Sequence, residues 1–201
     1  MVASIAHAGN GDLYVGTGSQ FDNGGGAGAS DFRGRGIWRS TDLGDTWEIV
    51  EGTDPGVLGS GDFTATDALV ADPNNPDRMY FGGDAGFGYI ENGVLTEDAG
   101  DGLPSNPVGD IAVDPEGSYM LVAMSNGRVY RSAGSDFGSF TSLSGSGDGE
   151  LPLSGLSRAR IDISQDDANH AYALYANSQE LFGGLYHSAD GGSTWEEVWP
   201  P

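Results

Sequence analysis

The sequence predicts an all-β fold built from about four repeated units of four short strands each. Three observations support this prediction. One eight-residue pattern occurs near both ends of the chain, strand-like segments recur between the two copies, and no segment keeps helical periodicity over about a dozen residues. The 35 glycines of this 201-residue chain are spread through the units, as expected for short strands joined by many turns.

The repeated pattern is S-x-D-x-G-x-T-W, and it predicts a turn between two strands. Its fixed positions are Ser40, Asp42, Gly44, Thr46 and Trp47 in the first copy and Ser188, Asp190, Gly192, Thr194 and Trp195 in the second. A turn aspartate accepts hydrogen bonds from nearby backbone N–H groups, and glycine adopts positive φ without a steric penalty. Each tryptophan is expected to bury its ring in the core. Every fixed position therefore has a structural task.

Each unit is expected to begin with two strands joined by a short turn. The first strands are predicted at 4–8, 68–73, 110–115 and 160–163, and the second strands at 13–16, 79–82, 119–122 and 171–174. A third strand of the form aliphatic, aromatic, basic, Ser occurs at 37–40, 129–132 and 185–188. The second unit instead has a hairpin centred on Asn92-Gly93, and 133–140 is a degenerate copy of the pattern.

The spacing of the two complete copies predicts a β-propeller. Asp42 and Asp190 lie 148 positions apart, which over three steps gives about 49 residues per unit, close to the length of a propeller blade. We expect one propeller domain over residues 1–201, with four-stranded blades at about 3–52, 62–98, 105–144 and 157–199.

Three arrangements of these blades stay open at this point. The chain forms a compact four-bladed ring, is a fragment of a larger propeller, or completes a ring with a second chain. An incomplete propeller exposes strand edges and apolar blade faces, so self-association is expected of it.

The pattern resembles the Asp-box, or bacterial neuraminidase repeat, of sialidases, xyloglucanases and sortilin-type receptors. In these families the box shapes the turn between the last two strands of a propeller blade and usually lies away from the active site. The resemblance therefore implies a structural role for Asp42 and Asp190. It also implies a module of a secreted or cell-surface bacterial protein, because the glycine-rich loop and the segment 36–42 are similar to repeat-rich exported bacterial proteins.

The charge of the chain limits its partners. Thirty acidic residues face eight basic ones, which are all arginine, and the net charge is −22. Such a surface repels nucleic acids and anionic membranes, and no stretch approaches the ~20 apolar residues of a membrane span. The acidity fits either solubility in a salty environment or binding of divalent cations such as calcium. Cysteine is absent, so disulfides and thiolate metal sites are excluded. The N-terminal segment has no signal-peptide pattern.

The loop from Gln20 to Arg35 is the main candidate for ligand binding, because it is much longer than a hairpin needs. Its candidate residues are Phe21, Asp22, Asp31, Phe32, Arg33 and Arg35. The loop either contacts a ligand, ion or partner, or is a solvated insertion. Its spacing is not that of an EF-hand.

Residues that suit catalysis or metal binding are scattered. Asp72 and Asp114 end two equivalent first strands, where they act either as an acid and base pair or, as the repetition favours, as turn caps. His7, His170 and His187 are interpreted as lying in different units, without metal-ligand spacing. No nucleophile elbow or phosphate-binding loop occurs.

Two functions follow from these features. The first is a non-catalytic module that serves as a scaffold or binds glycan or protein. The second is a glycoside hydrolase of sialidase or xyloglucanase type. A sialidase needs an arginine cluster, but Arg39 and Arg131 occupy repeat-equivalent strand positions, and the F-R-I-P signature is missing. The xyloglucanase fold implies two propellers around a cleft, which this chain is too short to form. The sequence therefore favours the first function.

Overall fold

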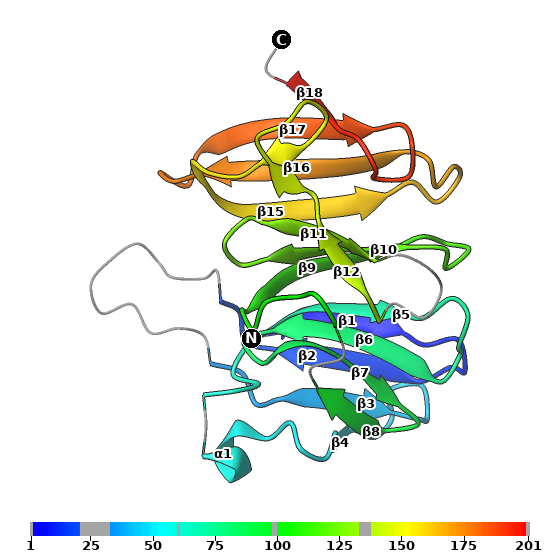
Figure 1. The fold of residues 1–201 in the computed structure, drawn as a ribbon. Coiled ribbons are helices and arrows are strands. Elements are labelled where there is room, and N and C mark those ends of the chain that lie inside the picture. Colours follow the sequence, from blue (N-terminus) through cyan, green and yellow to red (C-terminus); the bar gives the residue numbers. More distant parts are fainter. Residues whose placement is uncertain (1, 21–32, 60, 98–99, 133–137, 200–201) are drawn as a thin grey trace. The chain divides into compact units, whose positions relative to one another are not determined.

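The computed structural model describes residues 2–20, 33–59, 61–97, 100–132 and 138–199 (Figure 1). The chain divides into two compact units, residues 1–99 and 100–201. Each unit contains two four-stranded antiparallel sheets whose strands follow one another in sequence order. The predicted all-β fold of four-stranded units is therefore confirmed.

The first unit contains sheets 1 and 2. Sheet 1 consists of β1 (Val2–His7), β2 (Leu13–Thr17), β3 (Ile37–Ser40) and β4 (Glu48–Ile49). Sheet 2 consists of β5 (Thr66–Ala71), β6 (Arg78–Gly83), β7 (Gly86–Glu91) and β8 (Val94–Glu97). One helical turn, α1 (Pro55–Leu58), lies on the connection between the sheets, where the Asp54 side chain caps its N-terminus.

The second unit contains sheets 3 and 4. Sheet 3 consists of β9 (Val108–Val113), β10 (Met120–Met124), β11 (Val129–Ser132) and β12 (Phe140–Ser142). Sheet 4 consists of β15 (Leu156–Ile163), β16 (Ala171–Asn177), β17 (Phe182–Ser188) and β18 (Glu196–Trp199). Between the two sheets lies a short parallel pair, β13 (Ser144–Gly145) and β14 (Leu151–Pro152), which the sequence did not predict.

The predicted hairpin in the second unit forms as expected. Residues Asn92 and Gly93 join β7 to β8, and both have positive φ, 52° and 81°. Two consecutive positive φ values are the signature of the type I′ turn that an Asn-Gly pair favours.

The core of each unit lies between its two sheets. Residues that pair across strands share one face of a sheet, so the strand register assigns every side chain to a face. We name the face that packs against the following sheet of the unit the forward face and the opposite one the backward face. Tyr14 and Ile37 lie on the forward face of sheet 1, and Val15 and Trp38 on its backward face.

The same packing occurs in both units. The forward face of sheet 1 packs against the backward face of sheet 2, which contributes Leu69, Met79, Phe81 and Ile90. The forward face of sheet 3, with Leu121 and Val129, packs against the backward face of sheet 4. That face contributes Ala159, Ile161, Ile163, Ala171, Ala173 and Tyr175. Alternation along each strand therefore places apolar side chains where two sheets meet.

Glycine is required where the long β2–β3 connection leaves sheet 1. Gly18 has a φ of 76°, and a Cβ atom at this position would lie 1.9 Å from the Thr64 carbonyl oxygen. The connection returns at Gly34, whose N–H donates to the same oxygen at 2.6 Å. Both ends of the loop are thus held against the segment that precedes β5.

We predict that Gly18→Ala destabilises the first unit far more than Gly11→Ala. Both glycines have positive φ, which costs an alanine about 1–2 kcal/mol. A Cβ at Gly11 would meet nothing within 4 Å, whereas the clash at Gly18 adds about 1–3 kcal/mol. Urea unfolding of the two variants measures the difference, and equal losses would contradict the proposed clash.

Candidate functional site

The first copy of the repeated pattern forms the turn between β3 and β4 through side-chain hydrogen bonds. Ser40 Oγ donates to Asp42 Oδ1 and accepts from the Gly44 N–H, both at 2.8 Å. Asp42 also accepts from the N–H and the hydroxyl of Thr46. The Trp47 indole N–H donates to the Gly44 carbonyl at 3.0 Å. The five fixed residues therefore form one continuous hydrogen-bonded network.

The second copy makes the same contacts between β17 and β18. Ser188 bonds Asp190 and the Gly192 N–H, and Asp190 accepts from the N–H and hydroxyl of Thr194. The Trp195 indole N–H donates to the Gly192 carbonyl at 3.1 Å. Since the two sequences share five of eight positions, the shared residues are the ones that make these contacts.

The two tryptophans differ in burial, although both were expected to be buried. Trp195 is 6% exposed and belongs to the core of the second unit, whereas Trp47 is only half-buried. The reason lies in the segment before sheet 4. The Gly149 carbonyl of this segment accepts a hydrogen bond from the backbone N–H of Trp195, and Leu151 belongs to the same apolar cluster as the Trp195 ring. The turn itself therefore does not bury its tryptophan.

Hydrogen bonding stabilises the ionised form of both turn aspartates. At Asp42 the Thr46 hydroxyl and N–H and the Ser40 hydroxyl lower the pKa to about 2. At Asp190 burial favours the neutral form, but the bonds from Thr194, Ser188 and Ser193 outweigh it and also lower the pKa to about 2. Each carboxylate therefore accepts its hydrogen bonds from residues of its own turn.

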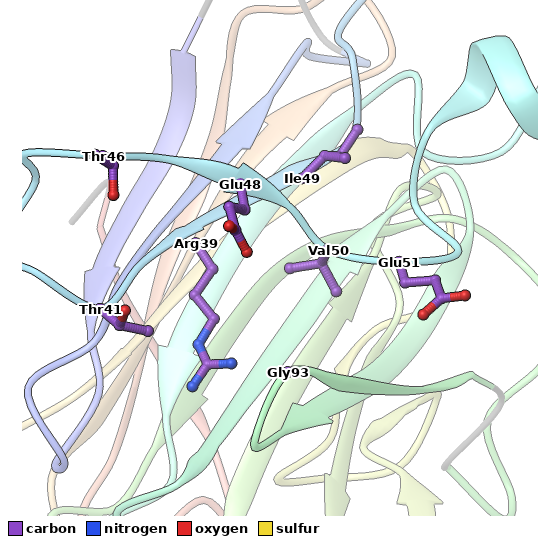
Figure 2. A pocket seen from close by; sticks show the side chains of 8 residues that line it. All are labelled: Arg39, Thr41, Thr46, Glu48, Ile49, Val50, Glu51 and Gly93. Carbon is purple, nitrogen blue, oxygen red and sulfur yellow. The ribbon is translucent and has the colours of Figure 1, made fainter.

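A polar pocket of about 270 Å³ lies beside the first of these turns (Figure 2). It is lined by Arg39, Thr41, Thr46, Glu48, Ile49, Val50, Glu51 and Gly93. Figure 2 shows the Arg39 side chain extending from β3 toward Gly93 of sheet 2. Arg39 Nε donates to Asp12 Oδ2 at 2.7 Å, so Asp12, which is 7% exposed, compensates its charge. The pocket thus combines a fixed cation with carboxylates and hydroxyl groups.

A second polar pocket, of about 430 Å³, surrounds the equivalent arginine of the second unit. Arg131 lies over the ring of Tyr119 at 4.5 Å and donates from Nε to the Gly191 carbonyl at 2.7 Å. Burial raises the pKa of Tyr119 to about 12, with a further contribution from Asp114. The carboxylates that line the pocket are Asp114, Glu116, Asp166, Asp167 and Asp190.

The two pockets share an arginine at one position of the repeat, although the rest of their linings differs: the β3–β4 region in the first and the β9–β10 and β15–β16 turns in the second. Arg39 and Arg131 follow the aromatic residue of the third strand, and each lies against the turn of the following sheet, at Gly93 and at Gly191. The recurring third-strand form, aliphatic, aromatic, basic, Ser, was the sequence feature that could have located both pockets. From the sequence alone, this form indicates only a structural role.

Asp72 and Asp114 are each held within a turn. Asp72 accepts from the N–H groups of Asn74 and Asn75 and from the Tyr80 hydroxyl. Asp114 accepts from the N–H groups of Glu116 and Ser118. The two aspartates are 5% and 2% exposed and belong to different units. Neither pairs with a second free carboxylate in the contacts described.

The histidines are distributed differently from the prediction that they lie in different units. His187 lies in β17 of sheet 4 and His170 directly precedes β16 of the same sheet, and His170 Nδ1 lies 2.9 Å from His187 Nε2. The ring planes differ by 11° and the ring centroids are 5.1 Å apart, so the rings meet edge to edge. The β16–β17 register, which the sequence did not provide, brings them together.

The candidate binding loop is described only in part. Phe21, Asp22, Asp31 and Phe32 lie outside the described residues. Arg33 and Arg35 are exposed, and the Arg35 N–H donates to Thr17 Oγ1 at 2.7 Å. At the start of the loop, Ser19 and Gln20 donate to Asp67. The base of the loop is therefore anchored on sheet 2.

Two further findings concern metals and membranes. Within the described ranges, no group of three or more histidines or acidic residues is arranged to hold a metal ion. The same residues include no helix with the length and apolarity of a bilayer span.

No protein-family model and no curated protein sequence matches the chain. The chain is similar in structure to a GH74 xyloglucanase from Xanthomonas campestris, with a TM-score of 0.66 and 18% identity over 98% of this chain and 29% of that protein. It is similar to the Dos1 propeller, with a TM-score of 0.63 and 16% identity over 99% of this chain and 50% of that one.

A third similar structure is PorZ, a bacterial surface component of the type-IX secretion system of Porphyromonas gingivalis. Its TM-score is 0.57 at 16% identity, over 98% of this chain and 22% of PorZ. The chain thus spans half or less of the length of all three proteins. These similarities show the fold: sheets 1 to 4 are blades of a β-propeller.

We predict that Trp195→Ala costs about 3–5 kcal/mol of unfolding free energy, the usual range for a buried tryptophan. Trp47→Ala, which removes a half-buried ring from the same turn, is the matched variant and costs less than half as much. Urea unfolding provides the comparison. Equal losses of unfolding free energy would contradict the assignment, because they would mean that packing against Leu151 adds nothing to the contribution of Trp195.

We also predict a loss of stability in acid that depends on Asp190. A carboxyl whose pKa is lower in the folded protein stabilises the fold above its ordinary pKa, and this contribution disappears as the pH falls through the folded value. The unfolding free energy should therefore decrease between the ordinary value of 3.8 and about pH 2.

The variant Thr194→Val removes the hydroxyl that donates to Asp190 Oδ2 and should reduce this pH dependence. Ser193→Ala is the control, because the Ser193 hydroxyl donates to the Asp190 carbonyl and not to its carboxylate. Chemical unfolding as a function of pH measures both, and an identical slope in the two variants would refute the assignment.

Proposed function

We propose that this chain is a non-catalytic propeller module of a secreted or cell-surface bacterial protein and that it binds glycan. We also propose that its two repeated turns are Asp-boxes with a structural role, and that residues 1–201 form one propeller domain or part of a larger one. The observation that carries the binding role is the polar pocket beside Arg39, and a second polar pocket contains the repeat-equivalent Arg131.

The chemistry of the first pocket suits a sugar. A glycan presents many hydroxyl groups, which donate to carboxylates such as Glu48 and Glu51 and accept from an arginine. Ile49 and Val50 add an apolar part to the lining, against which the C–H groups of a sugar ring can pack. A protein ligand with a polar loop is the second class that this lining fits.

The carboxylates argue against hydrolysis. Glycoside hydrolases use two carboxyl groups on either side of the scissile bond, one of them as the acid. Asp72 and Asp114, the candidates for such a pair, are buried, hydrogen-bonded in separate turns and in different units. The alternative function, a glycoside hydrolase, rests on the similarity to a xyloglucanase of which this chain spans 29%.

Titration calorimetry with xyloglucan oligosaccharides and sialyllactose tests the proposal. We expect binding of one of these probes, and we expect Glu51→Gln to weaken it about tenfold, because a neutral amide oxygen replaces a charged hydrogen-bond acceptor. Glu97→Gln, an exposed carboxylate on β8 outside the pocket, is the control and should keep wild-type affinity.

Enzymatic activity is measured on the same samples with a fluorogenic sialoside and with xyloglucan. The proposal predicts no product above the buffer control. Hydrolysis that is lost in Asp72→Asn or Asp114→Asn, with the fold retained, would establish the hydrolase instead. Absence of binding to either probe and to a broad glycan array would overturn the glycan role.

A further inference from the structure

Each unit of two sheets leaves two sheet faces without a partner sheet inside that unit, and on two of these four faces the large apolar side chains are exposed. The forward face of sheet 1 covers the backward face of sheet 2, and the forward face of sheet 3 covers the backward face of sheet 4. The backward face of sheet 1 and the forward face of sheet 4 have no such partner in their own units. Both carry large exposed apolar side chains, which in a soluble protein mark a contact surface.

The backward face of sheet 1 is apolar and carries no acidic residue. Val2 and Ile5 of β1 are 60% and 68% exposed. The register places Ile5 beside Val15, Trp38 and Ile49 in one row across the four strands. The other described residues on this face are His7, Leu13, Thr17 and Ser40. A face without carboxylates is unusual in a chain with 30 acidic residues.

The forward face of sheet 4 carries a matching apolar row. Leu174 pairs with Leu185, which pairs with Trp199. Leu174 is 45% and Trp199 52% exposed, and Tyr172 and Phe182 on the same face are 43% and 48% exposed. A groove of about 420 Å³ opens here, lined in part by Leu174, Ala176, Leu181 and Phe182 and by the side chains of Arg158 and Arg160.

The two faces correspond to the two sides of the contacts inside each unit. In the repeat, Tyr172 and Leu185 of sheet 4 occupy the positions of Tyr14 and Ile37, which form the forward face of sheet 1. Likewise Leu13 and Val15 occupy the positions of Met79 and Phe81, which receive that face on sheet 2. A contact between the forward face of sheet 4 and the backward face of sheet 1 would therefore repeat the packing that occurs inside both units.

We propose that the forward face of sheet 4 binds the backward face of sheet 1 in a second copy of this chain, head to tail. The repeat favours this pairing over contact between two like faces, because a forward face packs against a backward face inside each unit. The forward face of sheet 4 carries Arg158 and Arg160 beside Asp162 and Glu196, so its charges are mixed. The backward face of sheet 1 carries no carboxylate that would repel the two acidic groups. The contact is heterologous, so it yields a closed ring or a growing chain of copies.

Sedimentation velocity over a roughly hundredfold range of protein concentration tests the proposal. We expect concentration-dependent association that strengthens with added salt, because two chains of charge −22 repel each other and salt screens that repulsion. The readout does not involve glycan, so failure here and failure of the glycan-binding function are distinguishable.

Two variants place a charge on one face each. Leu174→Glu and Ile5→Glu should each weaken association at least about tenfold, because the contact would bury an unpaired carboxylate. Both positions are exposed, so the fold is retained, and circular dichroism checks this. Val57→Glu on α1, at an 81% exposed position outside both faces, is the control and should associate like the wild type.

Mixing the variants identifies the pairing. Each variant alone keeps one intact face, so neither should self-associate, but an equimolar mixture should form a dimer of one chain of each kind. A wild-type chain that stays monomeric at every concentration and salt level would overturn the proposal. A mixture that stays monomeric would also overturn it. Normal association of the Ile5→Glu variant would do the same, because it would indicate contact between two sheet 4 faces.

Discussion

The packing of one sheet's forward face against the next sheet's backward face is the constraint on which both units depend. Each sheet has only four short strands, and it buries its apolar face by packing against another layer. Stacking two sheets creates the clusters that hold Tyr14 and Ile37 in one unit and Leu121 and Val129 in the other. In β2 and β16 the buried positions alternate with more exposed ones, whereas β10 is buried throughout.

The third-strand arginine connects that packing to the pockets. In the first unit the turn of sheet 2 favours glycine at Gly93 for its positive φ, and Arg39 Nη1 lies only 2.4 Å from where a Cβ atom would be. In the second unit Arg131 bonds the Gly191 carbonyl directly. A residue that links two sheets thereby also forms the base of a polar hollow at their edge. This is why one position in the repeat is both structural and available to a ligand.

The sequence predicted the features that depend on local order. The four sheets and the Asn92-Gly93 hairpin follow from strand alternation and turn chemistry within a few residues. It could not predict features that depend on neighbours distant in sequence. Trp47 and Trp195 share one local pattern but differ in burial, because Leu151 covers only the second. The His170–His187 contact and the two pockets likewise arise from register and from sheet stacking, which no local pattern specifies.

Sheet 4 departs from the repeat at the basic position of the third strand. Where sheets 1 and 3 have Arg39 and Arg131, sheet 4 has His187, whose ring is hydrogen-bonded to His170. Such a bond needs one ring nitrogen to donate and the other to accept, so at least one of the two rings is neutral. A permanent cation at this position would need a carboxylate or carbonyl partner, as Asp12 and the Gly191 carbonyl serve Arg39 and Arg131. The histidine pair satisfies its own central hydrogen bond within the sheet. At this position of the third strand, an apolar surface such as the row from Ile5 to Ile49 can therefore cover sheet 4 without burying a guanidinium there, while Arg160 on the same face donates to the Gly109 carbonyl of sheet 3.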